Sequence, residues 1–298
     1  MNITAIILTS NEDKHLARCI DSVRAITSDI LVVDSYSTDS TKKIAEQKGA
    51  TFHRRKWINY ATQFNWALTQ LKPNTNWVLR IDADEVITDV LAKEILKKIP
   101  MVDDSVDGIY VCRRMIFQSQ LIKYGGLFPL KVIRLMRYER GECENRWMDE
   151  HIKVRGKTIH FSGEIVDDNL NSLTWWTDKH NKYASREAVD LLNLEFNFMH
   201  HDTVASLRGL TQPGLKRWVK ECVYARLPTG LRSLFYFLYR YFIRLGFLDG
   251  RQGLTFHFLQ GFWYRYLVDA KILEVKRFAK EKKVDIKIAI AEVLGIYV

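Results

Sequence analysis

Residues 77–85 read WVLRIDADE, an apolar run that ends abruptly in two carboxylates spaced one residue apart. The run predicts a buried strand, on which alternate side chains point to the same side. We therefore expect Asp82 and Asp84 to converge on one point, where their charges repel unless a cation lies between them. A hard divalent cation, Mg²⁺ or Mn²⁺, prefers such oxygen ligands and often accompanies a diphosphate. The same acids could instead cap a helix predicted over residues 86–99, because negative charge is favourable at a helix N-terminus.

Strands and helices alternate in the first half of the chain. Apolar runs and capped amphipathic segments predict strands at 3–8, 30–33, 50–54 and 77–81, and helices at 14–25, 41–48 and 61–71. This alternation is typical of an α/β fold with a mainly parallel, doubly wound sheet. Ligands bind such sheets beyond the carboxyl ends of the strands. Polar side chains follow three of the strands, at 9–12, 34–35 and 82–84, and the sequence therefore predicts a binding site at that edge.

Composition limits the class of protein. The chain has 298 residues, of which 47% are hydrophobic, which indicates one large domain, or a domain with an appendage, around a sizeable core. Its four cysteines are scattered without a CxxC pair, which argues against a zinc site or a disulfide framework and fits a reducing compartment. Neither a signal peptide nor a transmembrane helix is expected, because the N-terminus lacks a basic segment and no run of 18 apolar residues occurs.

The net charge of +10 predicts an anionic partner. Nine lysines and arginines lie between Arg208 and Arg251 against two acids, among the aromatic and aliphatic runs 233–245 and 252–264. Such runs are too short to span a bilayer and suit helices that lie in the interface of an anionic membrane, with Arg and Lys toward lipid phosphates. A helical subdomain that packs its aromatic side chains against the sheet is the alternative. No nucleic-acid-binding module is recognisable, so nucleic acid is not an expected partner.

Several segments in fixed order resemble glycosyltransferase family 2, which has the GT-A nucleotide-sugar-binding fold. They are IILTSNE at 6–12, VVDSYSTDST at 32–41, QFNWAL at 63–68 and the DxD motif DADE at 82–85. Further segments, GGLFP at 125–129, Arg134-Leu135 and WMDEH at 147–151, are similar to the subgroup that builds bacterial lipopolysaccharide core, capsule or exopolysaccharide. The resemblance implies a GT-A transferase domain at 1–205, and we expect residues 206–298 to form a helical, basic-aromatic, membrane-associating extension.

The resemblance also implies how a donor is held. Asp34 would accept hydrogen bonds from the uracil or ribose of a UDP-sugar, with Thr9, Glu12 and Asp82 beside it. Asp84, assisted by Asp82, would hold the Mn²⁺ or Mg²⁺ that bridges the diphosphate. Many family members carry a second acid or Asn-Gly after the residue equivalent to Asp34, where this chain has Ser35 and Tyr36.

The family inverts the anomeric centre, which requires a carboxylate that deprotonates the acceptor hydroxyl. The resemblance points to Glu150 in WMDEH as this base, with Asp149 as the substitute. The alternative is that these two acids only form a solvated turn without a catalytic role. His180 lies where the subgroup tends to carry a histidine that ligates the metal or contacts the diphosphate. A structural histidine is the alternative there.

The resemblance thus implies a metal-dependent, inverting hexosyltransferase that moves a sugar from a nucleotide-sugar, with UDP as the expected nucleotide, to a lipid-linked or oligosaccharide acceptor in bacterial cell-surface glycan synthesis. Its expected place is the cytoplasmic face of the bacterial inner membrane, as a peripheral protein. A sugar nucleotidyltransferase is a first alternative, although residues 9–12 offer no glycine-rich phosphate loop. A non-catalytic, membrane-associated scaffold on a decayed transferase fold is the second, and the intact acids argue against it.

Overall fold

The computed structural model describes residues 2–144, 151–198 and 230–298. The chain divides into two compact units, residues 1–171 and 172–298. The domain boundary predicted between residues 205 and 206 falls in the segment 199–229, outside the described residues. Helix α5 (Leu173–Phe196), which that prediction assigns to the transferase domain, belongs to the second unit.

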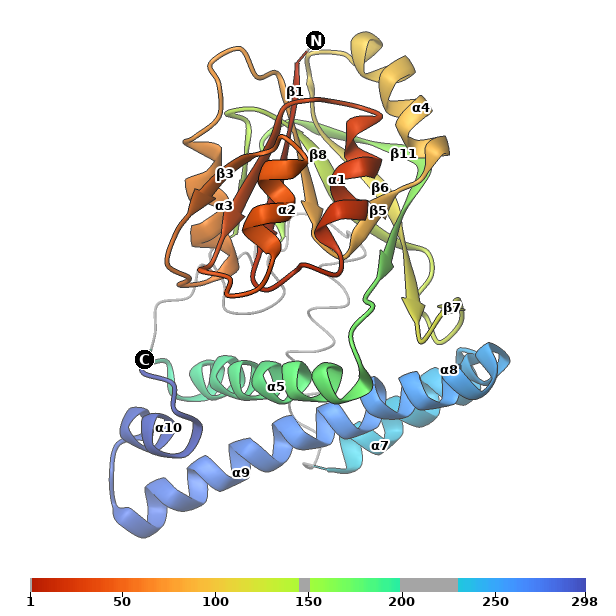
Figure 1. Ribbon diagram of the computed structural model, residues 1–298. Coiled ribbons are helices and arrows are strands. Elements are labelled where there is room, and N and C mark those ends of the chain that lie inside the picture. The colour runs from red at the N-terminus through yellow and green to blue at the C-terminus, as the bar shows by residue number, and fades with distance from the viewer. Residues whose placement is uncertain (1, 145–150, 199–229) are drawn as a thin grey trace. The chain divides into compact units, whose positions relative to one another are not determined.

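A nine-stranded sheet forms the centre of the first unit (Figure 1). Its order is β3-β2-β1-β4-β8-β6-β11-β5, and β7 pairs with β6. Strands β3, β2, β1 and β4 are parallel, whereas β8, β5 and β7 run antiparallel to their neighbours. The strands are β1 (Ile3–Thr9), β2 (Ile30–Asp34), β3 (Thr51–Arg54), β4 (Trp77–Asp82), β5 (Glu85–Ile87), β6 (Val106–Phe117), β7 (Gln120–Ile122), β8 (Leu130–Arg137) and β11 (Lys157–Asp168). Strands β9 (Gly141–Cys143) and β10 (Ile152–Val154) pair separately.

Helices cover both faces of this sheet because its strands are apolar on both sides. In β1, Ile3, Ala5 and Ile7 pack on the face that carries α1 (Leu16–Arg24), α2 (Thr41–Gln47) and α4 (Asp89–Lys98). Ile6 points to the opposite face and packs with Phe64 of α3 (Tyr60–Leu68). A short 3₁₀ turn, η1 (Ile99–Met101), follows α4. The predicted α/β fold, with its first four strands in parallel, is confirmed.

The region after the DxD motif differs from the prediction. Residues 85–87 form β5 against β11, and the helix expected from residue 86 begins at Asp89. Its cap is Thr88, whose Oγ1 accepts a hydrogen bond from the Leu91 amide at 3.3 Å. Pairing with β11 buries Glu85 and Ile87, so tertiary contacts override the local helix signal. The interpretation of the acidic motif as a helix cap is wrong.

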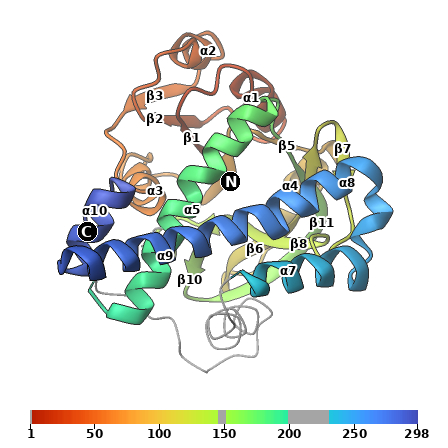
Figure 2. The ribbon, with the colours of Figure 1, turned by 90° about the horizontal axis from the view of Figure 1, so that it is seen from below.

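The second unit is helical in its described part, as predicted. It contains α5, α7 (Leu231–Leu238), the π-helical η4 (Tyr239–Ile243), the 3₁₀ turn η5 (Gly246–Asp249), α8 (Gly250–Phe256), the π-helical η6 (His257–Trp263), α9 (Tyr264–Lys282) and α10 (Ile286–Leu294). Helices α5 and α9 cross, as Figure 2 shows, and pack with α10 around an apolar core that includes Ala188, Leu192, Ile272 and Ile290. Among the described helices, none has the length and apolar character needed to cross a membrane.

Candidate active site

Three neighbouring parallel strands end together at one edge of the first unit's sheet, the lower edge in Figure 1. Thr9 of β1 is in register with Asp34 of β2, and Leu8 of β1 is in register with Asp82 of β4. The polar side chains that end these strands therefore lie in adjacent positions along one edge. This is the edge at which the sequence predicts a site.

The Asp34 carboxylate is fully buried and held by three hydrogen bonds. Thr9 donates from Oγ1 to Oδ1 at 3.0 Å, and Ser37 donates from its amide to Oδ2 at 2.8 Å and from its hydroxyl to Oδ1. Arg54 places Nε 3.9 Å from Oδ2. Thr9 and Asp34 are thus brought together as predicted, in one rigid group, and their contact with a nucleotide stays a prediction.

Glu12 is connected to the backbone of Leu170, near the end of the first unit, through the buried side chain of His15. Its Oε2 lies 2.7 Å from Nδ1 of His15, and Nε2 of His15 accepts the Leu170 amide at 2.9 Å. Because Nε2 accepts, Nδ1 carries the proton and donates to Glu12. One oxygen of Glu12 is therefore used inside the protein. Its predicted role at the nucleotide is not tested by these contacts.

Asp82 lies at the end of β4 and is held as an anion. Tyr60 donates its hydroxyl to Oδ1 at 2.7 Å, Arg134 donates from Nη2 to Oδ2 at 3.1 Å, and Arg80 donates from Nε to the Tyr60 oxygen at 2.8 Å. Burial opposes ionisation, but the charges of Arg134, Arg80 and Arg113 outweigh it and hold the pKa of Asp82 well below its usual range. Asp82 is therefore negatively charged at any physiological pH.

Beneath Asp82 lies a buried group of charges that the sequence reasoning missed. Glu85 is fully buried, bonds to Arg134 and has Nε of Arg113 at 3.2 Å; Arg113 in turn bonds to Asp167 of β11. Burial, reinforced by the charges of Asp82 and Asp167 and opposed by Arg134, raises the pKa of Glu85 to about 7. Asp167 and Asp168 lie at the end of β11, a strand with alternating apolar residues. Acids at the end of a predicted strand are also the signal that identifies Asp82.

Asp84 differs from its neighbours because its carboxylate forms no ion pair with a described residue, although Nη2 of Arg18 lies 3.4 Å from its backbone carbonyl oxygen. Its Oδ2 accepts a hydrogen bond from Nδ2 of Asn169 at 3.0 Å, and its backbone carbonyl accepts the Asp168 amide at 3.1 Å. Among residues 2–144, 151–198 and 230–298, no lysine, arginine or histidine forms an ion pair with its carboxylate. The side chain is only partly buried. Asp84 therefore presents a carboxylate that is oriented by Asn169 and forms no ion pair within the described part of the chain.

This donor set fits Mg²⁺ or Mn²⁺. Both ions accept one or two carboxylates and complete their coordination with substrate phosphates and water. The described residues contain no group of three or more His, Cys, Asp or Glu side chains placed to enclose a metal ion. Two partly exposed carboxylates, Asp82 and Asp84, of which Asp84 forms no ion pair with a described residue, are suited to a cation that arrives with a phosphate ligand.

His180 belongs to α5 in the second unit. Its ring stacks on Trp176, with ring centroids 3.5 Å apart, and Nδ1 lies 2.8 Å from the Trp176 carbonyl oxygen. The rings of Tyr183 and Tyr264 meet it edge-on. Burial lowers the pKa of His180 to about 4. The ring is thus a packed, neutral part of the helical core at pH 7, and its predicted metal role stays a prediction.

The predicted base residues, Glu150 and Asp149, lie outside the described residues. The structure does show what holds the two ends of their segment. The Glu144 amide donates to the His151 carbonyl at 2.9 Å, which closes the connection between β9 and β10. The side chain of Asn65 in α3 forms two hydrogen bonds with the backbone of Cys143, both 2.8 Å long. Nδ2 of Asn65 donates to the Cys143 carbonyl, and the Cys143 backbone amide donates to Oδ1 of Asn65. The Asn of the QFNWAL segment therefore anchors the strand that leads into WMDEH.

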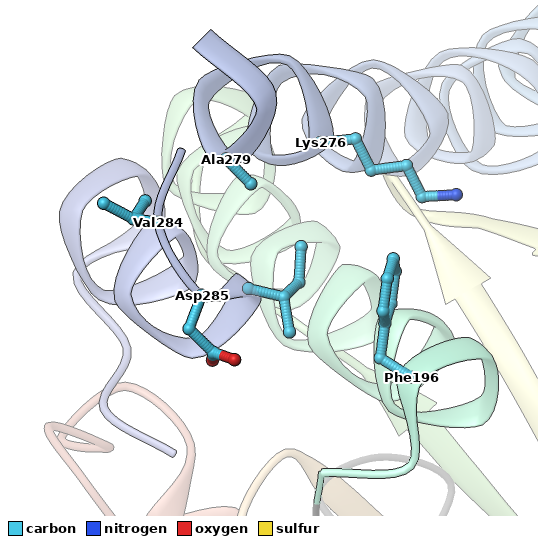
Figure 3. Close-up of a pocket in the computed structure, with 6 residues that line it drawn as sticks. Phe196, Lys276, Ala279, Val284 and Asp285 are labelled. Atoms are coloured by element: carbon cyan, nitrogen blue, oxygen red, sulfur yellow. The ribbon is translucent and has the colours of Figure 1, made fainter. Parts of the chain in front are cut away.

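Two surface hollows lie away from these acids. One, of about 290 Å³, is lined by Asn65, Leu68 and residues of β9 and β10. The other, of about 460 Å³, lies in the second unit between the ends of α5, α9 and α10 (Figure 3), and Phe196, Lys276 and Asp285 are among its lining residues. Asp34, Asp82 and Asp84 line neither of these two hollows.

Comparisons with known proteins identify the family of this chain. The sequence profile of glycosyl transferase family 2 matches residues 4–168. An uncharacterized glycosyltransferase of Rickettsia typhi is 27% identical over 290 residues, which are 92% of this chain and 87% of that protein. The lipopolysaccharide core biosynthesis glycosyltransferase LpsC of Rhizobium meliloti is 28% identical over 204 residues, 62% of this chain and 70% of that protein.

Among solved structures, the chain is similar to glucosyl-3-phosphoglycerate synthase from Mycobacterium tuberculosis in complex with Mn²⁺, UDP and glucosyl-3-phosphoglycerate. The match has 17% identity and a TM-score of 0.33, and it covers 38% of this chain and 44% of that one. The family profile, in contrast, covers more than half of this chain and contains the whole strand-end cluster. The chain therefore belongs to glycosyl transferase family 2 and is a glycosyltransferase that uses a nucleotide-sugar.

Proposed function

We propose that this enzyme transfers a hexose from a UDP-sugar, with inversion and with Mn²⁺ or Mg²⁺, to a lipid-linked or oligosaccharide acceptor in bacterial cell-surface glycan synthesis. One observation carries the proposal. Asp34, Asp82 and Asp84 lie at one sheet edge, and among these three only the carboxylate of Asp84 forms no ion pair with a described residue. Such a site is complementary to a nucleoside diphosphate that brings its own divalent cation.

The donor side follows from the two strand ends that flank β1. Asp34, fixed by Thr9 and Ser37, is placed for the nucleoside, and the exposed ring of Tyr36, in the left-handed backbone region at φ 58°, offers a stacking surface beside it. Asp82 and Asp84 would hold the cation. When bound, it would neutralise the charge that develops on the leaving diphosphate. Arg134 and Tyr60 keep Asp82 ionised and fixed in orientation for that task.

The acceptor side rests on the segment between β9 and β10. Glu150, or Asp149 in its place, would take the proton of the attacking hydroxyl, and Asn65 would hold the strand that positions them. The similarity to LpsC, which acts in lipopolysaccharide core biosynthesis, supports an acceptor in cell-surface glycan synthesis.

A donor screen tests the proposal. The purified full chain is incubated with UDP-, GDP- and dTDP-sugars, with Mn²⁺, Mg²⁺ or EDTA, and nucleotide diphosphate release is measured with and without a lipid-linked core acceptor. We expect release from one or more UDP-sugars that stops with EDTA. Formation of a nucleotide-sugar and pyrophosphate from UTP and a sugar phosphate would identify a nucleotidyltransferase instead. Tight UDP binding without turnover of any donor would support the non-catalytic scaffold.

A further inference from the structure

The stretch Leu231–Trp263 forms two antiparallel helical arms, α7 with η4 and α8 with η6, joined by the turn at residues 244–249; we call it the aromatic hairpin. The arms lie side by side in Figure 2. Phe237 of the first arm meets Phe258 and Phe262 of the second, with ring centroids 6.1 and 6.5 Å apart. The hairpin is therefore a defined structural element of the second unit.

The polarity of the aromatic hairpin is inverted relative to a water-exposed helical pair. Large apolar side chains are exposed along both arms and the turn, among them Phe235, Leu238, Phe242, Ile243, Leu248 and Phe258; Ile243 is 71% exposed. Charged and polar side chains are inside instead. Arg232, Arg240, Asp249 and His257 are all buried, with Arg240 only 2% exposed. Water favours the opposite distribution. Burying a charge costs its hydration free energy, and exposing an apolar side chain to water is unfavourable as well.

The buried charges are paired within the unit. Arg232 Nε bonds to both oxygens of Asp269 in α9, at 2.8 and 2.9 Å. Arg240 bonds from Nη1 to Gln260 and places Nη2 3.2 Å from Nδ1 of His257, whose Nε2 lies 3.4 Å from Asp249. The prediction that arginines of this region face lipid phosphates is wrong for Arg232 and Arg240. Nε of Arg240 is buried without a hydrogen-bond partner among the described residues, whereas the other buried polar groups bond to one another. Polar groups paired inside an apolar exterior are the arrangement found where hydrocarbon replaces water.

The exposed charges lie in or next to the turn. Within the described stretch Leu231–Trp263, the exposed charged side chains are Arg244, at the start of the turn, and Arg251, in the first turn of α8. The first arm, Leu231–Ile243, has about 13 residues and is thus about 20 Å long, shorter than the ~30 Å hydrocarbon core of a bilayer. The second arm continues directly into α9, and none of the described helices is long and apolar enough to cross a membrane. Two exposed arginines beside exposed Phe242, Ile243 and Leu248 are the combination expected at the depth where acyl chains meet lipid phosphates.

We propose that the aromatic hairpin inserts its exposed apolar side chains into the interfacial layer of an anionic lipid bilayer, with Arg244 and Arg251 at the lipid phosphates. This goes beyond the transferase activity and does not depend on it. We take the partner to be a lipid surface because the exposed apolar side chains lie beside two exposed arginines and, within Leu231–Trp263, no exposed acid, which suits a layer of acyl chains under anionic phosphates.

Flotation of the full chain with vesicles tests the proposal, in detergent-free buffer. Vesicles of phosphatidylethanolamine and phosphatidylglycerol (3:1) are compared with vesicles of phosphatidylcholine alone. We expect the wild type to float with both and more strongly with the anionic vesicles. Ile243→Glu with Leu248→Glu should lower the partition coefficient at least about tenfold on both vesicle types, because two charges enter the apolar layer. Arg244→Gln with Arg251→Gln should remove only the preference for phosphatidylglycerol.

The matched control is Val90→Glu with Leu96→Glu in α4, where Leu96 is 53% exposed against 52% for Leu248. This variant should float like the wild type, and circular dichroism should show all variants folded. The proposal is wrong if the wild type does not float with either vesicle, or if Ile243→Glu with Leu248→Glu floats equally well. A dimer seen by light scattering that this double variant dissociates, without vesicle binding, would identify the hairpin as an interface between two copies. UDP-sugar turnover is measured on the same variants, so loss of membrane binding is separated from loss of catalysis.

Discussion

Arg134 bonds through a single nitrogen, Nη2, to two carboxylates of the DADE motif, Asp82 and Glu85. Arg134 and Glu85 are buried, while Asp82 reaches the open edge of the sheet. The arginine on β8 thus joins the end of β4 to the start of β5 beneath the predicted cation site. Its position makes the orientation of Asp82 depend on a residue some fifty positions away in the sequence.

Replacing Arg134 by Met should therefore destabilise the protein strongly. At pH 8, above the pKa of about 7 of Glu85, the change leaves an ionised Glu85 buried beside Asp82 without its main counter-charge, and breaking a buried ion pair costs about 3–5 kcal/mol. Urea unfolding of the full chain measures the change in the free energy of unfolding. Adding Glu85→Gln to Arg134→Met should recover part of the loss, because the unpaired charge disappears. A loss below about 1 kcal/mol for the single variant contradicts the arrangement described here.

Asp84→Asn should abolish metal-dependent turnover while leaving the fold intact. The carboxylate has no cationic partner among the described residues, so its charge is available to a cation and not needed for pairing. We expect UDP-sugar turnover to fall at least about a hundredfold, in the range seen when a key electrostatic group is removed. Asp21→Asn, which alters an exposed acid that pairs with Lys48, serves as the control. Undiminished turnover of Asp84→Asn, or turnover that persists in excess EDTA, removes the cation from this site.

Glu150→Gln should reduce kcat by about 10²–10⁴-fold, because the glutamine amide cannot accept the proton of the acceptor hydroxyl. The donor KM should change little. Asp149→Asn is the matched variant and should keep most of the activity. If the two results are exchanged, Asp149 is the base; near-full activity in both variants places the base elsewhere.

Asn65→Leu should lower activity through the acceptor side of the site. It removes both hydrogen bonds to the Cys143 backbone and leaves two buried polar groups without their partner, which costs about 1–3 kcal/mol. We expect kcat to fall while the donor KM stays close to that of the wild type. Asn65→Asp keeps the acceptor for the Cys143 amide but loses the donor for the Cys143 carbonyl. Its kcat should therefore lie between that of the wild type and that of Asn65→Leu. Wild-type kcat in Asn65→Leu would show that this anchor does not position the WMDEH segment.

The helical unit should lose stability as the pH falls from about 6.5 to about 4. Burial lowers the pKa of His180 and of His257 to about 4, and the charge of Arg240 adds to the effect at His257. The unfolded chain, with histidine pKa values near 6.5, binds these protons first, so each histidine should remove about 2 kcal/mol at pH 5 relative to pH 7. Urea unfolding at the two pH values measures this. His180→Phe keeps the ring stack on Trp176 and should remove that histidine's share; an unchanged pH dependence contradicts the assignment.

The parts of the fold that could be predicted are those encoded locally. The strands β1 to β4 and the helices between them follow from apolar periodicity and caps that lie within each segment. Strand β5 could not be predicted in this way, since Glu85–Ile87 has only three residues and becomes a strand through its pairing with β11, some eighty residues later. A long-range ladder therefore decides the structure of the motif on which the sequence reasoning began.

The site shows the same division. Thr9, Asp34, Asp82 and Asp84 are recognisable because each follows a strand or belongs to a short motif. Arg134 stands out in the sequence only through the resemblance to the family, and no sequence pattern predicts the roles of Arg113, Asp167 and His15. These residues act through partners that are distant in the sequence, so no spacing rule connects them. The end of β11, with two acids and Asn169 after an alternating strand, was the one local signal that could have revealed more of the site.

The sheet order has a geometric consequence for the DADE turn. Strands β4 and β5 are separated in the sheet by β8, β6 and β11, yet Asp82 ends one and Glu85 begins the other. With strands about 4.8 Å apart, a flat sheet would place them about 19 Å from each other, and three residues reach only about 10 Å. The sheet must therefore curl until its last strand returns to its middle. The DADE turn is therefore held from two sides of the sheet, because Asp82 ends β4 in the middle and the Asp84 carbonyl accepts the Asp168 amide from β11 near the end.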